Sequence, residues 1–221
     1  GDAVTAYVLY MDDGSGADGA VSTEAYRGAL TSSVEVSGLA GGRSYKFAVS
    51  ALSLSGEGDR SDVLSQSTAP AAGSAAESVS QTASSIQLSW LAPSVSTGLA
   101  STGYRVYDVS SVGSEVVVYD GAGSSVLSAD VPSLESGRLY TYVVSAVSEG
   151  GQGGVSSALS ISSAVSAPTE VSSTSQTSQS VDLSWTAPSA ADSDSAVSGY
   201  LVYAEEAGVS TLAYTAPDNA D

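Results

Sequence analysis

Apolar and polar residues alternate with a period of two along most of this chain. The segment IQLSW (86–90) places its Ile, Leu and Trp on one side and its Gln and Ser on the other. The segments GYRVYDV (103–109) and YTYVVSAVS (140–148) alternate in the same way. Because successive side chains of a strand point to opposite faces, this pattern predicts β-strands that are each buried on one face.

Clusters of Gly, Ser and Asp separate the predicted strands. Examples are DDGSGADG (12–19), DGAGSS (120–125) and EGGQGG (149–154), which are typical of hairpin turns and loops. No segment keeps a 3.6-residue apolar period between helix caps, so we expect essentially no helix. Short alternating strands at this spacing predict two antiparallel sheets packed face to face.

The chain repeats itself with a period of 95 residues. SQTASSIQLSWLAP (80–93) returns as SQTSQSVDLSWTAP (175–188), and LAGGRSYKFAVSALS (39–53) returns as LESGRLYTYVVSAVS (134–148). Solenoid repeats are about 20–50 residues long. A repeat of the length seen here is therefore a whole domain.

The landmarks divide the chain into one complete and two partial domains. We predict a partial domain that begins at its third strand (1–69), a complete domain (70–167) and a partial domain that holds only the first strands (168–221). An incomplete sandwich exposes an apolar face and an unpaired edge. Two explanations stay open: the chain is a window from a longer tandem array, or a neighbouring copy supplies the missing strands.

The complete repeat resembles a fibronectin type III domain. Its landmarks are the Trp of IQLSWLAP, the Tyr of TGYRVYD and the Leu-to-Tyr corner of LESGRLYTYVVSAVS. The resemblance implies an all-β fold of tandem, immunoglobulin-like antiparallel β-sandwiches, and it implies that the hydroxyl of the corner Tyr bonds to backbone a few residues upstream. The landmark residues are then the structural core of the repeats: Trp90, Trp185, Tyr104, Tyr200, Leu39, Tyr45, Leu134 and Tyr140.

Charge and residue types exclude several classes of protein. The chain has 24 acidic and 6 basic residues, and its net charge of −18 would repel a nucleic acid. It has no Cys and no His, so disulfides, thiolate metal sites and Ser-His-Asp or Cys-His catalytic arrangements cannot form within it. No apolar run reaches the roughly 18 residues of a membrane helix, so we expect no membrane insertion in this segment.

Carboxylates are the remaining candidates for chemistry. Asp12, Asp13 and Asp18 form a calcium-like cluster, and Asp192 and Asp194 form another, but neither has the ligand order of a calcium loop. Carboxylates at hairpin tips also lack the burial that acid–base catalysis needs. We therefore predict no catalytic residue, no metal site and no cofactor.

These observations predict non-catalytic spacer modules of a larger extracellular or cell-surface protein, with a role in a fibre or filament. The expected partners are neighbouring domains, other copies of the chain and O-linked glycans on its many serines. The alternative is a set of accessory domains of a secreted polysaccharide-active enzyme whose catalytic domain lies outside this chain. A carbohydrate-binding module would need an exposed aromatic row, to which Tyr107, Tyr119 and Tyr203 could contribute.

Overall fold

The structure is a computed structural model that describes residues 2–15, 19–94, 100–189 and 197–217. Within these ranges it contains seventeen strands in five sheets and no helix. Every strand pair in it is antiparallel. The predicted all-β fold is therefore confirmed. No described segment forms a helix that is long and apolar enough to cross a membrane.

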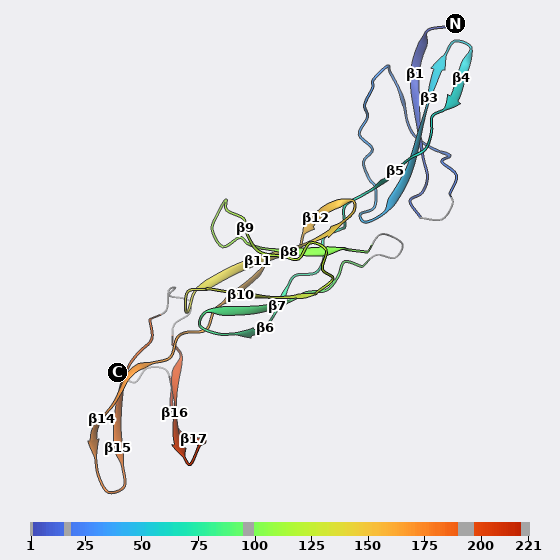
Figure 1. Cartoon of the computed structure of the whole chain (residues 1–221). Helices are drawn as coiled ribbons and strands as arrows, with labels where there is room; N and C mark the ends of the chain where they lie inside the picture. The colour runs from blue at the N-terminus through green and yellow to red at the C-terminus, as the bar shows by residue number, and fades with distance from the viewer. Residues whose placement is uncertain (1, 16–18, 95–99, 190–196, 218–221) are drawn as a thin grey trace.

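The middle domain is a sandwich of two antiparallel sheets (Figure 1). The first sheet has the order β10-β7-β6, formed by β6 (Glu77–Gln81), β7 (Ser85–Ser89) and β10 (Ser128–Pro132). The second has the order β12-β11-β8-β9, with β13 paired to β11, and consists of β8 (Gly103–Asp108), β9 (Val116–Asp120), β11 (Leu139–Ser148), β12 (Gly151–Val155) and β13 (Leu159–Ser162).

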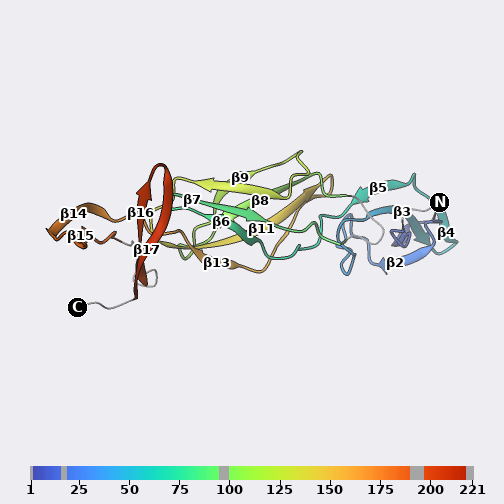
Figure 2. The same cartoon turned by 90° about the horizontal axis from the view of Figure 1, so that it is seen from below.

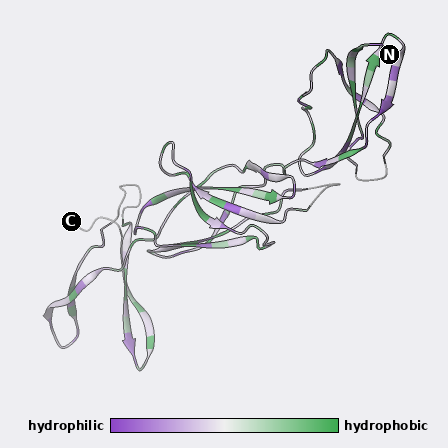
Figure 3. Cartoon of the chain, turned by 45° about the horizontal axis from the view of Figure 1, so that its top comes forward, coloured by the Kyte–Doolittle hydropathy of each residue, from purple (hydrophilic) through white to green (hydrophobic). Residues whose placement is uncertain are grey.

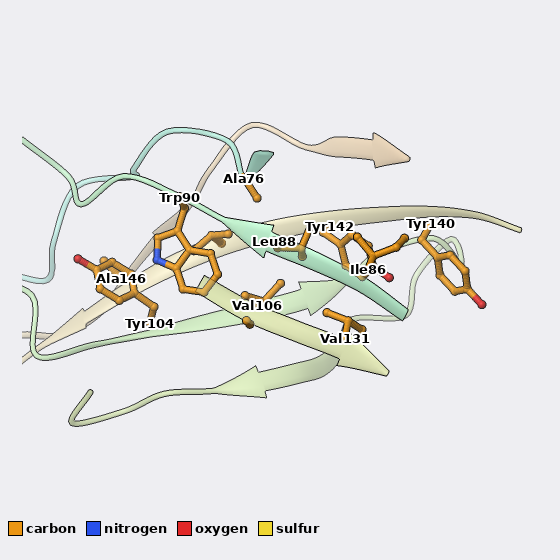
Figure 4. Packing of buried hydrophobic residues seen from close by; sticks show 12 residues of the cluster. Ala76, Ile86, Leu88, Trp90, Tyr104, Val106, Val131, Tyr140, Tyr142 and Ala146 are labelled. Carbon is orange, nitrogen blue, oxygen red and sulfur yellow. The ribbon is translucent and has the colours of Figure 1, made fainter. Parts of the chain in front are cut away.

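Alternate residues of these strands meet between the two sheets and form one core (Figure 4). Ile86 and Leu88 of β7 are fully buried, and so is Val106 of β8. Burying one such side chain contributes about 1.5–3 kcal/mol. The period of two in the sequence therefore corresponds to the inward face of each strand.

The N-terminal unit is a single sheet that repeats the second sheet of the middle domain. Its order is β2-β1-β3-β4, with β5 paired to β3. Its strands are β1 (Val4–Met11), β2 (Thr23–Gly28), β3 (Ser44–Ser53), β4 (Gly56–Arg60) and β5 (Leu64–Ser67). The register is also repeated, since Leu9 lies opposite Val49 as Val106 lies opposite Val144.

The C-terminal unit consists of two separate hairpins. The first is formed by β14 (Thr169–Gln176) and β15 (Val181–Thr186), and the second by β16 (Gly199–Glu206) and β17 (Val209–Pro217). The three units follow one another along the molecule, with the N-terminal sheet and the C-terminal hairpins at opposite ends (Figure 2). The domain boundaries at 69/70 and 167/168 stay predictions.

Candidate functional site

Trp90 connects the two sheets of the middle domain. It follows strand β7, is 4% exposed, and its ring centroid lies 5.8 Å from that of Tyr104 and 5.9 Å from that of Tyr119. Tyr104 and Tyr119 belong to β8 and β9 of the opposite sheet. Tilted aromatic pairs at such distances contribute about 0.5–1.5 kcal/mol each beyond their burial.

The corner tyrosines make the hydrogen bonds that the resemblance implies. The Tyr140 hydroxyl accepts the backbone N–H of Glu135 at 2.8 Å, and the Tyr45 hydroxyl accepts that of Ala40 at 2.9 Å. Both tyrosines are buried. Leu134 is partly buried against the core, and Leu39 is half-buried in its own unit. The corner thereby fixes the loop that leads into β11 in one domain and into β3 in the other.

Tyr142 lies next to Tyr140 but its hydroxyl is unsatisfied. The two rings are stacked with their centroids 6.1 Å apart. Tyr142 is fully buried, its hydroxyl has no hydrogen-bond partner among the residues that the structure describes, and burial raises its pKa. The N-terminal unit has Phe47 at the corresponding position, 95 residues earlier. A buried hydroxyl without a partner reduces stability, because it loses its bond to water and gains none in return.

We expect the two hydroxyl deletions to have opposite effects on stability. Tyr142→Phe should raise the free energy of unfolding by about 1 kcal/mol, because it removes an unsatisfied buried group. Tyr140→Phe should lower it by about 1 kcal/mol, because it removes the bond to Glu135. Urea unfolding of both variants measures the difference. A loss of stability in the Tyr142→Phe variant would contradict the structure.

A polar network on the outer face holds the β11–β12 hairpin against β8. The Arg105 guanidinium lies 3.2 Å from the Asp120 carboxylate and donates to the Gln152 side-chain oxygen at 2.9 Å. The Gln152 amide in turn donates to the Tyr107 hydroxyl at 2.7 Å. The hydrogen bond from Arg105 is the main reason why the pKa of Asp120 is lowered. Strands β8, β9 and β12 are tied together by these contacts.

A similar polar network, made of other residues, holds the β3–β4 hairpin of the N-terminal unit. The Tyr10 hydroxyl donates to Glu57 at 2.7 Å, and the Ser50 hydroxyl donates to the same carboxylate oxygen. Arg60 lies 3.6 Å above the Tyr10 ring. Hydrogen bonds from Ser50 and then from Tyr10 lower the pKa of Glu57. Glu57 corresponds to Gln152 in the repeat, so both hairpins are held by a buried tyrosine.

The linker from the N-terminal unit passes directly over the β11–β12 hairpin. A Cβ atom on Gly150 would lie 2.1 Å from the Thr68 carbonyl oxygen, and one on Gly153 would lie 2.3 Å from the Pro70 carbonyl oxygen. Real Cβ atoms essentially never approach closer than 3.0 Å. The two glycines therefore permit a contact between the linker and the next domain that no other residue type would allow without a shift.

The same linker is hydrogen-bonded to the unit that precedes it. The Gly42 N–H donates to the Ala69 carbonyl at 2.7 Å, and the Thr68 N–H donates to the Arg43 carbonyl at 2.8 Å. The Thr68 hydroxyl also donates to the Ala40 carbonyl at 2.7 Å. We refer to residues 68–72 together with residues 149–154 of the β11–β12 hairpin as the joint. The sequence predicts a hairpin loop at 149–154, but the structure confines the turn to 149–150 and places 151–154 in β12. No sequence pattern indicates that a linker packs on this hairpin.

The acidic clusters considered in the sequence do not assemble into a metal site among the described residues. Asp12 is 3% exposed, and one of its oxygens accepts the backbone N–H groups of Gly14 at 3.1 Å and Lys46 at 3.0 Å. It therefore stabilises the loop after β1. Asp13 of the same cluster accepts the backbone N–H of Ser15 at 2.9 Å. Asp18, Asp192 and Asp194 lie outside the described residues.

The three tyrosines considered for a carbohydrate platform do not form an exposed row. Tyr107 is buried and its hydroxyl accepts a hydrogen bond from Gln152, and Tyr119 packs on Trp90 in the core. Tyr203 of β16 is 58% exposed. In the C-terminal unit, Trp185 is half-buried and its ring centroid lies 5.1 Å from that of Tyr200. The pair of landmark residues therefore meets in this unit too, across its two hairpins.

Comparison with known proteins identifies the class of the middle domain. The family model for the fibronectin type III domain matches residues 72–162. No curated protein sequence matches the chain.

Solved structures of such domains also align with the chain. The sixth fibronectin type III domain of human fibronectin type III domain containing protein 3 is 27% identical, with 47% of this chain and 95% of that one covered and a TM-score of 0.39. The chicken CNTN1 FN1-FN3 domains are 17% identical, with 72% and 56% covered and a TM-score of 0.40. A two-domain segment of chicken tenascin is 17% identical, with 73% and 86% covered and a TM-score of 0.41.

The chain therefore has a fibronectin type III domain at its centre, flanked by repeats of the same sequence motifs.

Proposed function

We propose that this chain is a stretch of non-catalytic spacer modules in a larger extracellular or cell-surface protein, with a role in a fibre or filament. The observation that supports this best is the joint. Its linker is hydrogen-bonded to the N-terminal unit on one side and packs on glycine backbone of the middle domain on the other. A linker held on both sides keeps two successive domains at a fixed distance and angle, which is what a spacer requires.

Surface chemistry supports an exterior location. Fibronectin type III domains are common in extracellular and cell-surface proteins, and residues 72–162 match the family model of this domain. The serine-rich surface offers many hydroxyls for O-linked glycans. A net charge of −18 also keeps a long exposed array soluble. Antibodies against the middle domain should label intact, unpermeabilised cells of the source organism; labelling only after permeabilisation would contradict this location.

The spacer role makes a direct prediction about rigidity. Because the chain has no Cys, two introduced cysteines can be labelled specifically. Leu54 at the β3–β4 turn is 89% exposed, and Val112 in the loop after β8 is fully exposed. Spin labels at these two positions should give one narrow distance distribution by double electron–electron resonance. A broad distribution would show a flexible linker and would contradict the spacer role.

A further inference from the structure

A single stretch of chain joins each unit to the next, and it can be followed in Figure 3. The first linker begins at Thr68, directly after β5, and the second begins at Ser163, directly after β13 and 95 residues later. Each linker starts beside the loop that leads to a corner tyrosine. We call residues 39–43 and 134–138 the corner loops. Both linkers and both corner loops lie inside the described ranges.

The two linkers begin with the same contacts. The Thr68 N–H donates to the Arg43 carbonyl at 2.8 Å, and the Ser163 N–H donates to the Arg138 carbonyl at 3.0 Å. The hydroxyl oxygens of Thr68 and Ser163 accept the N–H groups of the same two arginines at 3.0 Å and 3.2 Å. The next linker residue accepts one more backbone hydrogen bond from the corner loop in both units. The start of each linker is therefore fixed in the same way.

The linkers diverge where the corner loops differ. The first loop has Gly41, and the second has Ser136 at the corresponding position. A Cβ atom on Gly41 would lie 2.7 Å from the Ala71 backbone nitrogen, which is closer than real Cβ atoms come. Ser136 carries a Cβ atom, and its hydroxyl oxygen accepts the N–H of Ser166, the counterpart of Ala71, at 2.7 Å. The first linker thus lies against glycine backbone, whereas a side chain holds the second linker away.

The linker residue at this point is flanked by residues that touch the next domain. A Cβ atom on Gly153 of the β11–β12 hairpin would lie 2.3 Å from the Pro70 carbonyl oxygen, and one on Gly154 would lie 3.7 Å from the Ala72 Cβ atom. Ala71, which lies against the corner loop, stands between Pro70 and Ala72. No free chain separates the two contacts, so a displacement of Ala71 must also displace the hairpin of the middle domain.

We propose that the residue at this position of the corner loop sets the angle between successive units. Glycine, as at position 41, lets the linker lie against the corner loop and gives one angle. Serine, as at position 136, holds the linker off through a hydrogen-bonded side chain and gives another. The linker is hydrogen-bonded in both cases, so each joint keeps its own fixed angle. This inference rests on the proposed spacer role and adds that one side chain at each joint determines the shape of the spacer.

Gly41→Ser in the whole chain tests the inference at the first joint. Spin labels at the exposed positions Leu54 and Val112 report the distance between the N-terminal unit and the middle domain. The distance distribution should stay narrow and move to a new mean. It moves because the new Cβ atom displaces Ala71, and it stays narrow because the new hydroxyl can accept the Ala71 N–H, as the Ser136 hydroxyl accepts its counterpart.

Gly58→Ser is the matched control, because it makes the same substitution in the same unit. Gly58 is exposed, and a Cβ atom there would meet the Ala51 carbonyl oxygen at 3.6 Å, an ordinary van der Waals contact. This variant should keep the mean distance of the unchanged protein.

The outcomes separate this inference from the spacer role. A narrow distribution whose mean Gly41→Ser does not move would overturn the inference and leave the spacer role intact. A distribution that Gly41→Ser broadens would overturn it too, because the side chain would then loosen the joint instead of resetting its angle. A broad distribution in the unchanged protein would contradict the spacer role itself, and this inference with it.

Amide hydrogen exchange tests the second linker without altering the first. Ser136→Ala keeps the Cβ atom and removes the hydroxyl that accepts the Ser166 N–H. Exchange of the Ser166 amide should become about fivefold faster, the factor expected for the loss of one hydrogen bond. The Gly137 amide, which donates to the Ala164 carbonyl, is the internal control and should keep its rate. An unchanged rate at Ser166 would show that Ser136 does not hold the linker and would also overturn the inference.

Discussion

Replacing Trp90 by alanine is expected to destabilise the middle domain by about 3–5 kcal/mol. The side chain is 4% exposed and contacts rings from two strands of the opposite sheet. Its loss removes buried apolar area and leaves a cavity that the neighbouring rings of Tyr104 and Tyr119 cannot fill without leaving their strands. A change of this size is a large fraction of the total stability of a small domain, which is about 5–15 kcal/mol.

Leu91→Ala is the matched control for this substitution. Leu91 is the next residue in the chain but is 70% exposed, so its truncation should change stability by no more than about 0.5 kcal/mol. Equilibrium urea unfolding followed by circular dichroism compares the two variants. Equal effects of the two substitutions would show that Trp90 does not hold the sheets together.

Gly150→Val is expected to break the joint and to leave both domains folded. The new side chain begins with a Cβ atom that would lie 2.1 Å from the Thr68 carbonyl oxygen. Because that neighbour is backbone, either the linker or the hairpin must move away. The distance distribution between labels at positions 54 and 112 should therefore broaden or shift, while the urea midpoint of the middle domain stays nearly unchanged.

Gly154→Ala provides the control within the same hairpin. A Cβ atom at Gly154 would meet Ala72 at 3.7 Å, which is an ordinary van der Waals contact. This variant should keep the distance distribution of the unchanged protein. If Gly150→Val kept that distribution as well, the contact between linker and hairpin would not determine how the domains are arranged.

The core of the middle domain could be predicted from the sequence because strand periodicity is local. Ile86 and Leu88 alternate with polar residues, and the structure buries both fully. The outer face could not be predicted in the same way. Ser145 and Ser50 are buried, although the alternation places them on the outward side of their strands. On that side the Ser145 hydroxyl donates to the Gly153 carbonyl of β12 at 2.8 Å, and the Ser50 hydroxyl donates to the Glu57 carboxylate of β4.

The joint was beyond sequence-based reasoning for a related reason. A glycine-rich loop such as 149–154 is expected at any tight hairpin, and Gly151 does adopt a positive φ of 106°. Gly150 and Gly153 have a different role, which depends on a linker about eighty residues earlier in the chain. No local pattern distinguishes a glycine needed for its backbone angle from one needed for the absence of a Cβ atom.

A rigid spacer requires a fixed arrangement of the N-terminal sheet and the middle domain. Residual dipolar couplings of the isotopically labelled chain in a weakly aligning medium measure this arrangement directly. If the joint holds, couplings from residues 4–67 and from residues 77–162 will fit a single alignment tensor together with the relative orientation described here. Two tensors of different magnitude would show that the units move independently and that the chain is not a rigid spacer.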